Sequence, residues 1–182
     1  TVSGGNVDWI SKKYNLPIDK LFHFKFPTEI EFQKNKIQII YLGWFWPDWS
    51  IKKNGLISSI YGLDLRKDKF ENTQDIRGFF SLDEDWVTLN QMIKYYKYGF
   101  GRISDYINED IRDKYITRDE GIKIISKYDH VCSKKYIKSF CKYIKISEDH
   151  FWFVVKNNVN KSLFKIDNNQ NITKKFVVGT GL

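Results

Sequence analysis

The sequence has few of the residues that build metal sites and disulfide frameworks, and it has no long apolar run. Among 182 residues there are two cysteines, three histidines and one methionine. Cys132 and Cys141 fit neither a C-x-x-C motif nor a common zinc spacing, so we expect free thiols in a reducing compartment. No histidine has a cysteine or carboxylate at ligand spacing, and we expect no metal site. No apolar run reaches about 18 residues and no signal-peptide pattern is present, so we expect no membrane span and a cytoplasmic location.

Basic, aromatic and hydrophobic residues are plentiful. Hydrophobic residues make up 42% of the chain, which is enough for a buried core, and aromatic residues make up 17%. The formal net charge of +8 favours an anionic partner such as nucleic acid, an acidic membrane or a phosphorylated small molecule. Because the lysines are spread along the whole chain, a lysine-rich coding bias explains the charge equally well. No helix-turn-helix, zinc-finger or RNP-like pattern is visible, so we do not expect nucleic-acid binding.

The first part of the chain gives mixed signals. A short helix is expected to end before Pro17, and LFHFKF at residues 21–26 alternates as a strand does. Residues 37–49 form the most apolar run, which fits a strand or a helix equally well. Ser50 is expected to cap a helix that Gly62 closes.

Two short stretches suggest binding, and each has a plainer explanation. SGGNVD at residues 3–8 is similar to the pyrophosphate loop SGG-x-D-S, but its aspartate comes one place late, so an ordinary turn is favoured. The aromatic cluster at residues 44–49 could stack a base or a sugar, although packing in a core or an interface is favoured.

The second half of the chain predicts helices more clearly. Residues 81–84 and 117–120 have the capping-box pattern S/T-x-x-E, in which two side chains satisfy free amides at the start of a helix. Ser133 and Ser147 are expected to cap two more helices. Residues 163–177 contain two short runs about a turn-rich centre, which indicates a weak hairpin.

The stretch NQMIKYYKYGFGRISDYINEDIR, residues 90–112, has an apolar stripe and two glycines. Its apolar residues recur every three or four positions, which predicts one buried face along a long helix or along two helices that meet at the glycines. In a helix interior, Gly99 and Gly101 would each cost about 0.5–1 kcal/mol relative to alanine. Either they let a ligand or another backbone approach the cations of this stretch, or they allow tight helix packing with the lysines in solvent.

Four stretches together resemble one known family. They are YLGWFWPDW (41–49), MIKYYKYGFGRISDYINEDIR (92–112), ITRDEGIKIISKYD (116–129) and C-x-x-x-YI-x-x-FCKYIKIS (132–147). Through these motifs the chain resembles the N-acetyl sugar amidotransferases of surface-polysaccharide (lipopolysaccharide, LPS) biosynthesis over roughly residues 37–160.

This resemblance implies an ATP-pyrophosphatase-type enzyme with a PP-loop in an α/β nucleotide-binding domain. Such an enzyme would use ATP and Mg²⁺ to activate the acetamido oxygen of a nucleotide-sugar or acidic sugar. Ammonia from a separate glutaminase subunit would then displace AMP and leave an acetamidino group. The family's pyrophosphate loop and cysteine cluster belong amino-terminal to the matching region, so we expect this chain to be a carboxy-terminal part. A non-catalytic helical domain that docks a glutaminase or a sugar-binding half is the alternative.

The implied fold is mainly α with a few short strands, as the carboxy-terminal helical part of an α/β adenine-nucleotide alpha-hydrolase-like enzyme. We expect residues 1–80 to be a remnant of the nucleotide-binding domain with a connecting segment. Residues 81–160 would form the helical region, and residues 161–182 a tail or weak hairpin.

The candidate site lies around the two glycines. We expect Arg102 and Lys97 to be catalytic and to face nucleotide phosphate or the acidic sugar, because fixed cations stabilise negative charge that gathers in a transition state. Asp105 would orient Arg102. The remaining expected binding residues are Lys94, Gly99, Gly101 and Arg112.

Overall fold

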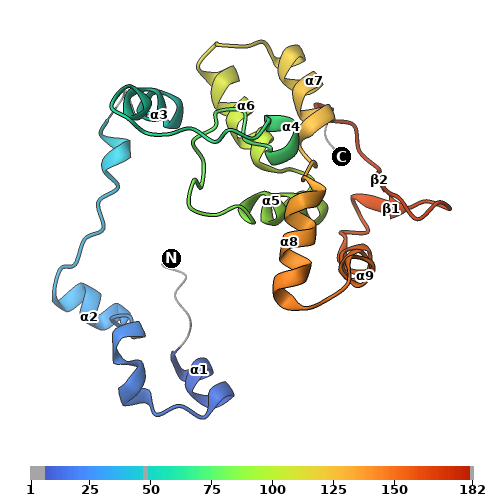
Figure 1. The fold of residues 1–182 in the computed structure, drawn as a ribbon. Helices are drawn as coiled ribbons and strands as arrows, with labels where there is room; N and C mark the ends of the chain where they lie inside the picture. Colours follow the sequence, from blue (N-terminus) through green and yellow to red (C-terminus); the bar gives the residue numbers. More distant parts are fainter. Residues whose placement is uncertain (1–6, 47–48, 181–182) are drawn as a thin grey trace. The chain divides into compact units, whose positions relative to one another are not determined.

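The computed structural model describes residues 7–46 and 49–180, and the chain divides into two units (Figure 1). The first unit runs from Thr1 to Trp49 and the second from Ser50 to Leu182. No helix in the described ranges is long and apolar enough to cross a membrane.

The first unit contains short helical segments. In chain order they are α1 (Val7–Tyr14), η1 (Ile18–Phe24), α2 (Glu29–Lys34) and η2 (Leu42–Trp44), of which the two η segments are 3₁₀ helices. The helix expected before Pro17 is confirmed. The strand expected at residues 21–26 is wrong, because most of that stretch belongs to η1. The amide of Lys20 donates to the carbonyl of Pro17 at 3.1 Å, which starts the 3₁₀ turn, and no strand in the described part of this unit is present to pair with it.

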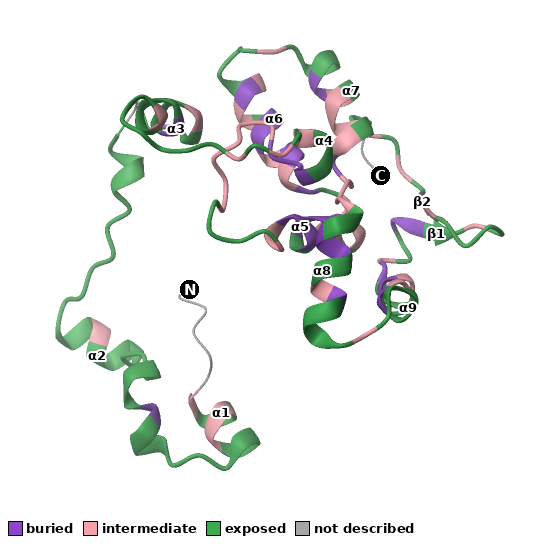
Figure 2. Ribbon diagram, viewed as in Figure 1, coloured by how far each residue is buried: buried purple, intermediate pink, exposed green. Residues whose placement is uncertain are grey.

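Little of the first unit is buried. Among its described residues only Leu21 is buried, and the side chains of Trp44 and Phe45 are 87% and 77% exposed (Figure 2). Residues 37–46 contain one 3₁₀ turn and form neither a strand nor a long helix. The apolar side chains of this stretch therefore find no core within the described part of the unit.

The second unit is mainly helical, as predicted. Its helices are α3 (Ile51–Ile60), α4 (Phe70–Thr73), α5 (Val87–Tyr98), α6 (Arg102–Arg112), α7 (Arg118–Tyr128), α8 (Lys134–Ile144) and α9 (Glu148–Asn158). The predicted hairpin is confirmed, since β1 (Phe164–Ile166) pairs antiparallel with β2 (Ile172–Lys174).

Four predicted helix caps are confirmed. The side-chain oxygens of Ser50, Thr117, Ser133 and Ser147 each accept a hydrogen bond from a backbone amide in the first turn of the helix that follows. At Thr117 the capping box is complete, because the Glu120 carboxylate also accepts from the Thr117 amide at 2.8 Å. These caps fix where α3, α7, α8 and α9 begin.

The capping box predicted for Ser81 and Glu84 is wrong. Helix α5 begins only at Val87, and Ser81 has a φ of +47°. The Arg66 guanidinium donates to the Ser81 carbonyl at 2.7 Å, and the Glu84 carboxylate accepts from the Trp86 amide at 2.6 Å. These contacts give the Ser81 carbonyl and the Trp86 amide hydrogen-bond partners while the segment stays irregular, so no helical turn starts there.

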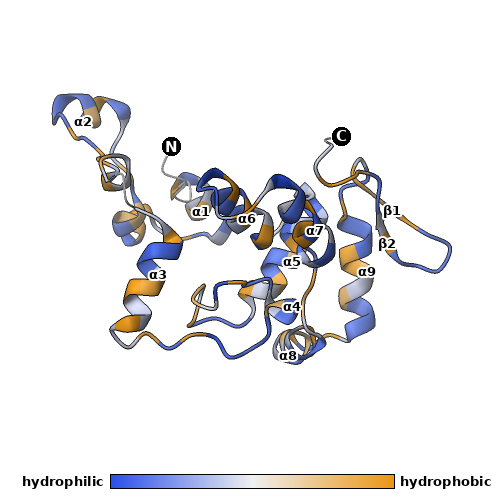
Figure 3. Ribbon diagram, turned by 90° about the horizontal axis from the view of Figure 1, so that it is seen from above, coloured by the Kyte–Doolittle hydropathy of each residue, from blue (hydrophilic) through white to orange (hydrophobic). Residues whose placement is uncertain are grey.

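The main core lies where α8 packs against both α5 and α9, while α6 packs against α7 (Figure 1). Helix α9 is hydrophobic in its middle and hydrophilic at both ends (Figure 3). The buried residues of this core come from α5, α8, α9, the segment after α9 and β1, and are Leu89, Met92, Tyr95, Ile137, Cys141, Phe151, Val155, Val159, Leu163 and Phe164. This core holds α5 firmly and leaves its carboxyl end beside the start of α6.

Candidate functional site

The stretch of residues 90–112 forms two helices with a break at its glycines. Helix α5 ends at Gly99, whose φ of +82° is the left-handed conformation that glycine adopts without strain. Helix α6 begins directly after Gly101, which is its N-cap residue. The expectation of two helices that meet at the glycines is confirmed. The expectation of one continuous helix is wrong, and neither glycine carries the cost of a helix interior.

The N-terminus of α6 is capped by a buried carboxylate from another part of the chain. Asp129 directly follows α7 and is fully buried. Its carboxylate accepts hydrogen bonds from the Gly101 amide at 2.7 Å, the Ser104 amide at 3.0 Å and the Ser104 hydroxyl at 2.7 Å. Burial raises the pKa of Asp129, while these hydrogen bonds lower it, and the pKa lies above its ordinary value. The carboxylate occupies the place where a helix N-terminus would bind phosphate.

Gly101 lets the chain itself approach α6. A Cβ atom at this position would lie 2.5 Å from Oε1 of Gln74 and closer still to the carbonyl oxygen of Asp129. The same Oε1 accepts from the Arg102 amide at 3.2 Å, and Gln74 Nε2 donates to the Val131 carbonyl at 2.8 Å. The atoms nearest to the two glycines belong to side chains and backbone of the same chain. A ligand-binding role for these glycines stays a prediction. We call residues 99–101, together with the Asp129 carboxylate and the Gln74 side-chain amide that bind the start of α6, the junction.

Three of the predicted site residues come together beside the junction. The Lys94 ammonium lies 2.9 Å from the Asp105 carboxylate, and the Arg102 guanidinium lies 3.7 Å from the same oxygen. The guanidinium also stacks 3.5 Å from the centre of the Phe80 ring, and the Lys94 ammonium lies 4.4 Å from the centre of the Phe100 ring. The three charged side chains are between 19% and 39% exposed. Asp105 therefore contacts Lys94 more closely than Arg102, the residue that it was expected to orient.

Lys97 and Arg112 occupy different surroundings. With Lys94, the exposed Lys97 lines a pocket of about 630 Å³ at the surface of α5, which we call the lysine pocket. Arg112 is exposed in the last turn of α6, about 15 Å along the helix from Arg102. No described residue forms an ion pair with Arg112, and the structure does not bring it to the lysine pocket.

Sequence reasoning missed a buried ion-pair network on α6. The Arg77 side chain is 5% exposed, and its guanidinium lies 2.7 Å from Glu109 and 3.0 Å from Asp110. Lys52 lies 3.4 Å from the same Asp110 carboxylate. Burial raises the pKa of Glu109 but the Arg77 guanidinium lowers it, and the result is below the ordinary value. The only local signal was Asp75, whose carboxylate accepts from the Arg77 amide in a tight turn.

Four buried polar side-chain atoms in the described residues have no hydrogen-bond partner, and three of them lie around Tyr106. These are the Tyr106 hydroxyl and the Nε atoms of Arg77 and Arg102. The guanidinium carbons of the two arginines lie 4.5 and 5.7 Å from the centre of the Tyr106 ring. Burial raises the pKa of Tyr106 above its ordinary value. The two guanidinium groups therefore lie near the Tyr106 ring without a described partner for either Nε atom.

The predicted absence of a metal site and the predicted nucleotide-binding stretches concern different residues. The described residues include no group of three or more His, Cys, Asp or Glu side chains that could hold a metal ion. The phosphate-loop-like SGGNVD lies mostly in residues 1–6, outside the described residues, and its last two residues begin α1. Lys94 and Arg102 already share the Asp105 carboxylate, and phosphate binding by them stays a prediction. The N-terminus of α6 offers no free phosphate site, because the carboxylate of Asp129 occupies it.

One known family covers most of the second unit. The family described as LPS biosynthesis protein WbpG-like, C-terminal domain, matches residues 64–177, which is more than half of the chain. The chain therefore belongs to this family of LPS biosynthesis proteins, and its resemblance to the carboxy-terminal part of such a protein is confirmed. The matched range contains the junction, the lysine pocket and the hairpin. No curated protein matches the sequence.

Proposed function

We propose that this chain is the carboxy-terminal part of an N-acetyl sugar amidotransferase that works in the cytoplasm. ATP with Mg²⁺ would activate the acetamido oxygen of the sugar with release of pyrophosphate. Ammonia from a glutaminase partner would then displace AMP and leave an acetamidino group. Membership in an LPS biosynthesis family supports the proposal. The amidotransferase-like motifs of residues 92–129, which surround the junction, support it as well.

The observation that carries the proposal is the arrangement of three cations. Lys94 and Lys97 line one pocket of about 630 Å³, and Lys94 shares the Asp105 carboxylate with Arg102. A pocket of this volume is of the size that holds a small ligand. Fixed cations beside it would stabilise the charge of a phosphate or of an acidic sugar.

Each side chain has a distinct role in this proposal. Lys97 and Lys94 would contact the anionic reactant directly, because both line the pocket. Arg102 would add positive charge from a fixed position, since its guanidinium stacks on Phe80 and is only 19% exposed. Asp105 would hold the Lys94 ammonium and the guanidinium in one place.

Pyrophosphate release tests the proposal. The full chain is mixed with a separately supplied nucleotide-binding half, ATP, Mg²⁺, ammonia and an acetamido sugar. We expect Arg102→Ala and Lys97→Ala to slow pyrophosphate release by about tenfold to a hundredfold, because each removes a cation near developing charge. Arg102→Lys keeps the charge and should lose less. Lys123→Ala, on the exposed face of α7, is the control and should match the unaltered chain.

A non-catalytic docking domain is the second candidate, and the first unit favours it. The exposed aromatic residues of the 41–46 stretch, such as Trp44 and Phe45, are of the kind that protein interfaces cover. If Arg102→Ala and Lys97→Ala release pyrophosphate as fast as the Lys123→Ala control, the catalytic proposal is wrong and docking is the better explanation.

A further inference from the structure

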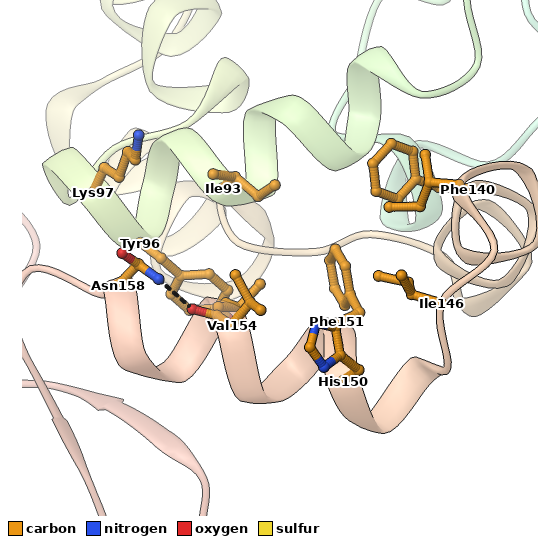
Figure 4. Close-up of a pocket in the computed structure, with 11 residues that line it drawn as sticks. Ile93, Tyr96, Lys97, Phe140, Ile146, His150, Phe151, Val154 and Asn158 are labelled. Carbon is orange, nitrogen blue, oxygen red and sulfur yellow. Dashed lines mark hydrogen bonds between the residues drawn. The ribbon is translucent and has the colours of Figure 1, made fainter.

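A second pocket lies between α5, α8 and α9, and the proposed function does not use its interior. It measures about 530 Å³, and most of its lining side chains are apolar. Ile93 from α5, Phe140 from α8 and Phe151 from α9 meet around it, with Ile146 from the turn between α8 and α9 (Figure 4). We call it the apolar pocket.

The rim of the apolar pocket exposes hydrophobic surface. Ile144 and Val154 line the pocket and are 41% and 44% exposed. Each square ångström of apolar surface left in water forgoes about 25 cal/mol of transfer free energy. An apolar ligand that covered these side chains would therefore bind favourably.

The two ends of the apolar pocket differ in charge. Lys97 and Asn158 lie at one end, and His150 and Ile146 lie towards the other (Figure 4). No acidic side chain lines the pocket, and no described residue forms an ion pair with Lys97. The side-chain amide of Asn158 already donates to the Val154 carbonyl at 2.8 Å. Lys97 is thus the one described lysine or arginine that lines the pocket, and its ammonium, which is turned away from α9 in Figure 4, would have to swing towards the pocket to meet an anionic group.

The backbone position of the cation is fixed. Asn160 donates from its side-chain amide to the Lys97 carbonyl at 3.1 Å and from its backbone amide to the Tyr96 carbonyl at 3.0 Å. These bonds tie the end of α5 to the segment after α9. Along α9 the pocket runs from His150 to Asn158, about 12 Å, which suits an extended alkyl chain of about ten carbons.

We infer that the apolar pocket binds a straight-chain amphiphile with one anionic head group. The alkyl chain would lie between α5 and α9 against Phe140 and Phe151, and the head group would meet the ammonium of Lys97. Lys97 borders both this pocket and the lysine pocket, so the two proposed ligands would compete for its ammonium. Occupancy of the apolar pocket is measured directly by binding and so does not depend on the proposed amidotransferase activity.

Calorimetric titration of the full chain with dodecanoate, below the concentration at which micelles form, tests the inference. We expect saturable binding at one site, and weaker binding of dodecanol and dodecyltrimethylammonium, which have the same chain without the negative charge. Val154→Glu should weaken dodecanoate binding by at least about tenfold, because it places a charge in the alkyl site. Lys97→Met should weaken it by about threefold and abolish the preference over dodecanol.

Matched variants keep the test decisive. Phe153→Glu changes a side chain on the same helix that is 63% exposed and does not line the pocket, so it should bind dodecanoate as the unaltered chain does. Ile144→Glu provides a second rim variant if Val154→Glu fails to fold, as judged by circular dichroism. Equal binding of dodecanol and dodecanoate, or equal losses in Phe153→Glu and Val154→Glu, would overturn the inference. So would self-association of the chain that Val154→Glu abolishes, since the pocket would then hold a second copy.

Discussion

The apolar pocket lies along helix α5 and the junction directly follows that helix, yet the chain fills the junction with its own groups and leaves the pocket open. At the junction, the amides of Gly101 and Arg102 both have acceptors from distant residues, and the Asp129 carboxylate is fully buried. At the apolar pocket, Ile144 and Val154 remain more than 40% exposed around an open space of about 530 Å³.

This difference separates stability from binding. Where the chain supplies its own partners, a substitution leaves buried groups unpaired and lowers the free energy of unfolding. Where apolar side chains face open space, a substitution removes few contacts of the free chain, and we expect it to act on the proposed ligand instead. Gly101 therefore contributes to the folding of this domain, and ligand contact by the two glycines and by the cations next to them stays a prediction.

The largest effect is expected when the junction loses its carboxylate. Asp129→Ala leaves the Gly101 amide, the Ser104 amide and the Ser104 hydroxyl without an acceptor. We expect the free energy of unfolding to fall by about 2–4 kcal/mol, measured by urea denaturation. Asp113→Ala removes an exposed carboxylate at the other end of α6 and should change it by less than about 0.5 kcal/mol. Similar losses in the two variants would show that the junction is not held by this cap.

A smaller effect is expected from filling the space at Gly101. Gly101→Ala forces a Cβ atom against Gln74 and the Asp129 carbonyl, so we expect a loss of about 2–3 kcal/mol in the free energy of unfolding. Gly62 has a φ of +101°, and a Cβ atom there would meet no other atom within 4 Å, so Gly62→Ala carries only backbone strain of about 1 kcal/mol. If Gly101→Ala is no more destabilising than Gly62→Ala, close contact does not explain the glycine.

The smallest expected effect concerns two histidines, one beside the junction and one at the apolar pocket. His130 is half-buried, with its ring 5.6 Å from that of Tyr95, and burial together with the charge of Lys174 lowers its pKa. The unfolded chain then binds a proton more readily than the folded chain. The resulting stability is fully present above the ordinary histidine pKa of about 6.5 and is lost as the pH falls through the lower value of the folded state.

Urea denaturation across this pH range measures the effect. His130→Asn should remove the part of the pH dependence that comes from His130, whereas His150→Asn, at the exposed rim of the apolar pocket, should keep it. An unchanged pH profile in His130→Asn would assign the loss of stability to another group.

Local patterns predicted the helix boundaries well where the partners are close in sequence. Thr117 and Glu120 are three residues apart, and their capping box formed as expected. The same pattern failed at Ser81, because Arg66, which comes 15 residues earlier, bonds to its carbonyl and holds an irregular segment. A pattern cannot report a competing partner that lies elsewhere in the chain.

The candidate site shows the same limit. The sequence predicted Lys97 and Arg102 as catalytic, with Asp105 beside Arg102 and Lys94 as a further binding residue. The structure brings Lys94, Arg102 and Asp105 together and leaves Lys97 in the lysine pocket. Nothing in the sequence indicated that Asp129 would cap α6 or that Arg77 would pair with Glu109. The residues of each pair are more than 25 positions apart, and a local sequence pattern does not link residues at that separation.

The sequence alone determined the mainly helical fold, the starts of α3, α7, α8 and α9, the hairpin and the resemblance to an LPS biosynthesis protein. Those features depend on periodicity, caps and turns, which act over about four residues of chain. Only the tertiary structure decided that the glycines serve an internal cap and that a pocket stays open between α5 and α9. Both depend on which distant side chains reach a given surface, and that is set by the packing of whole helices.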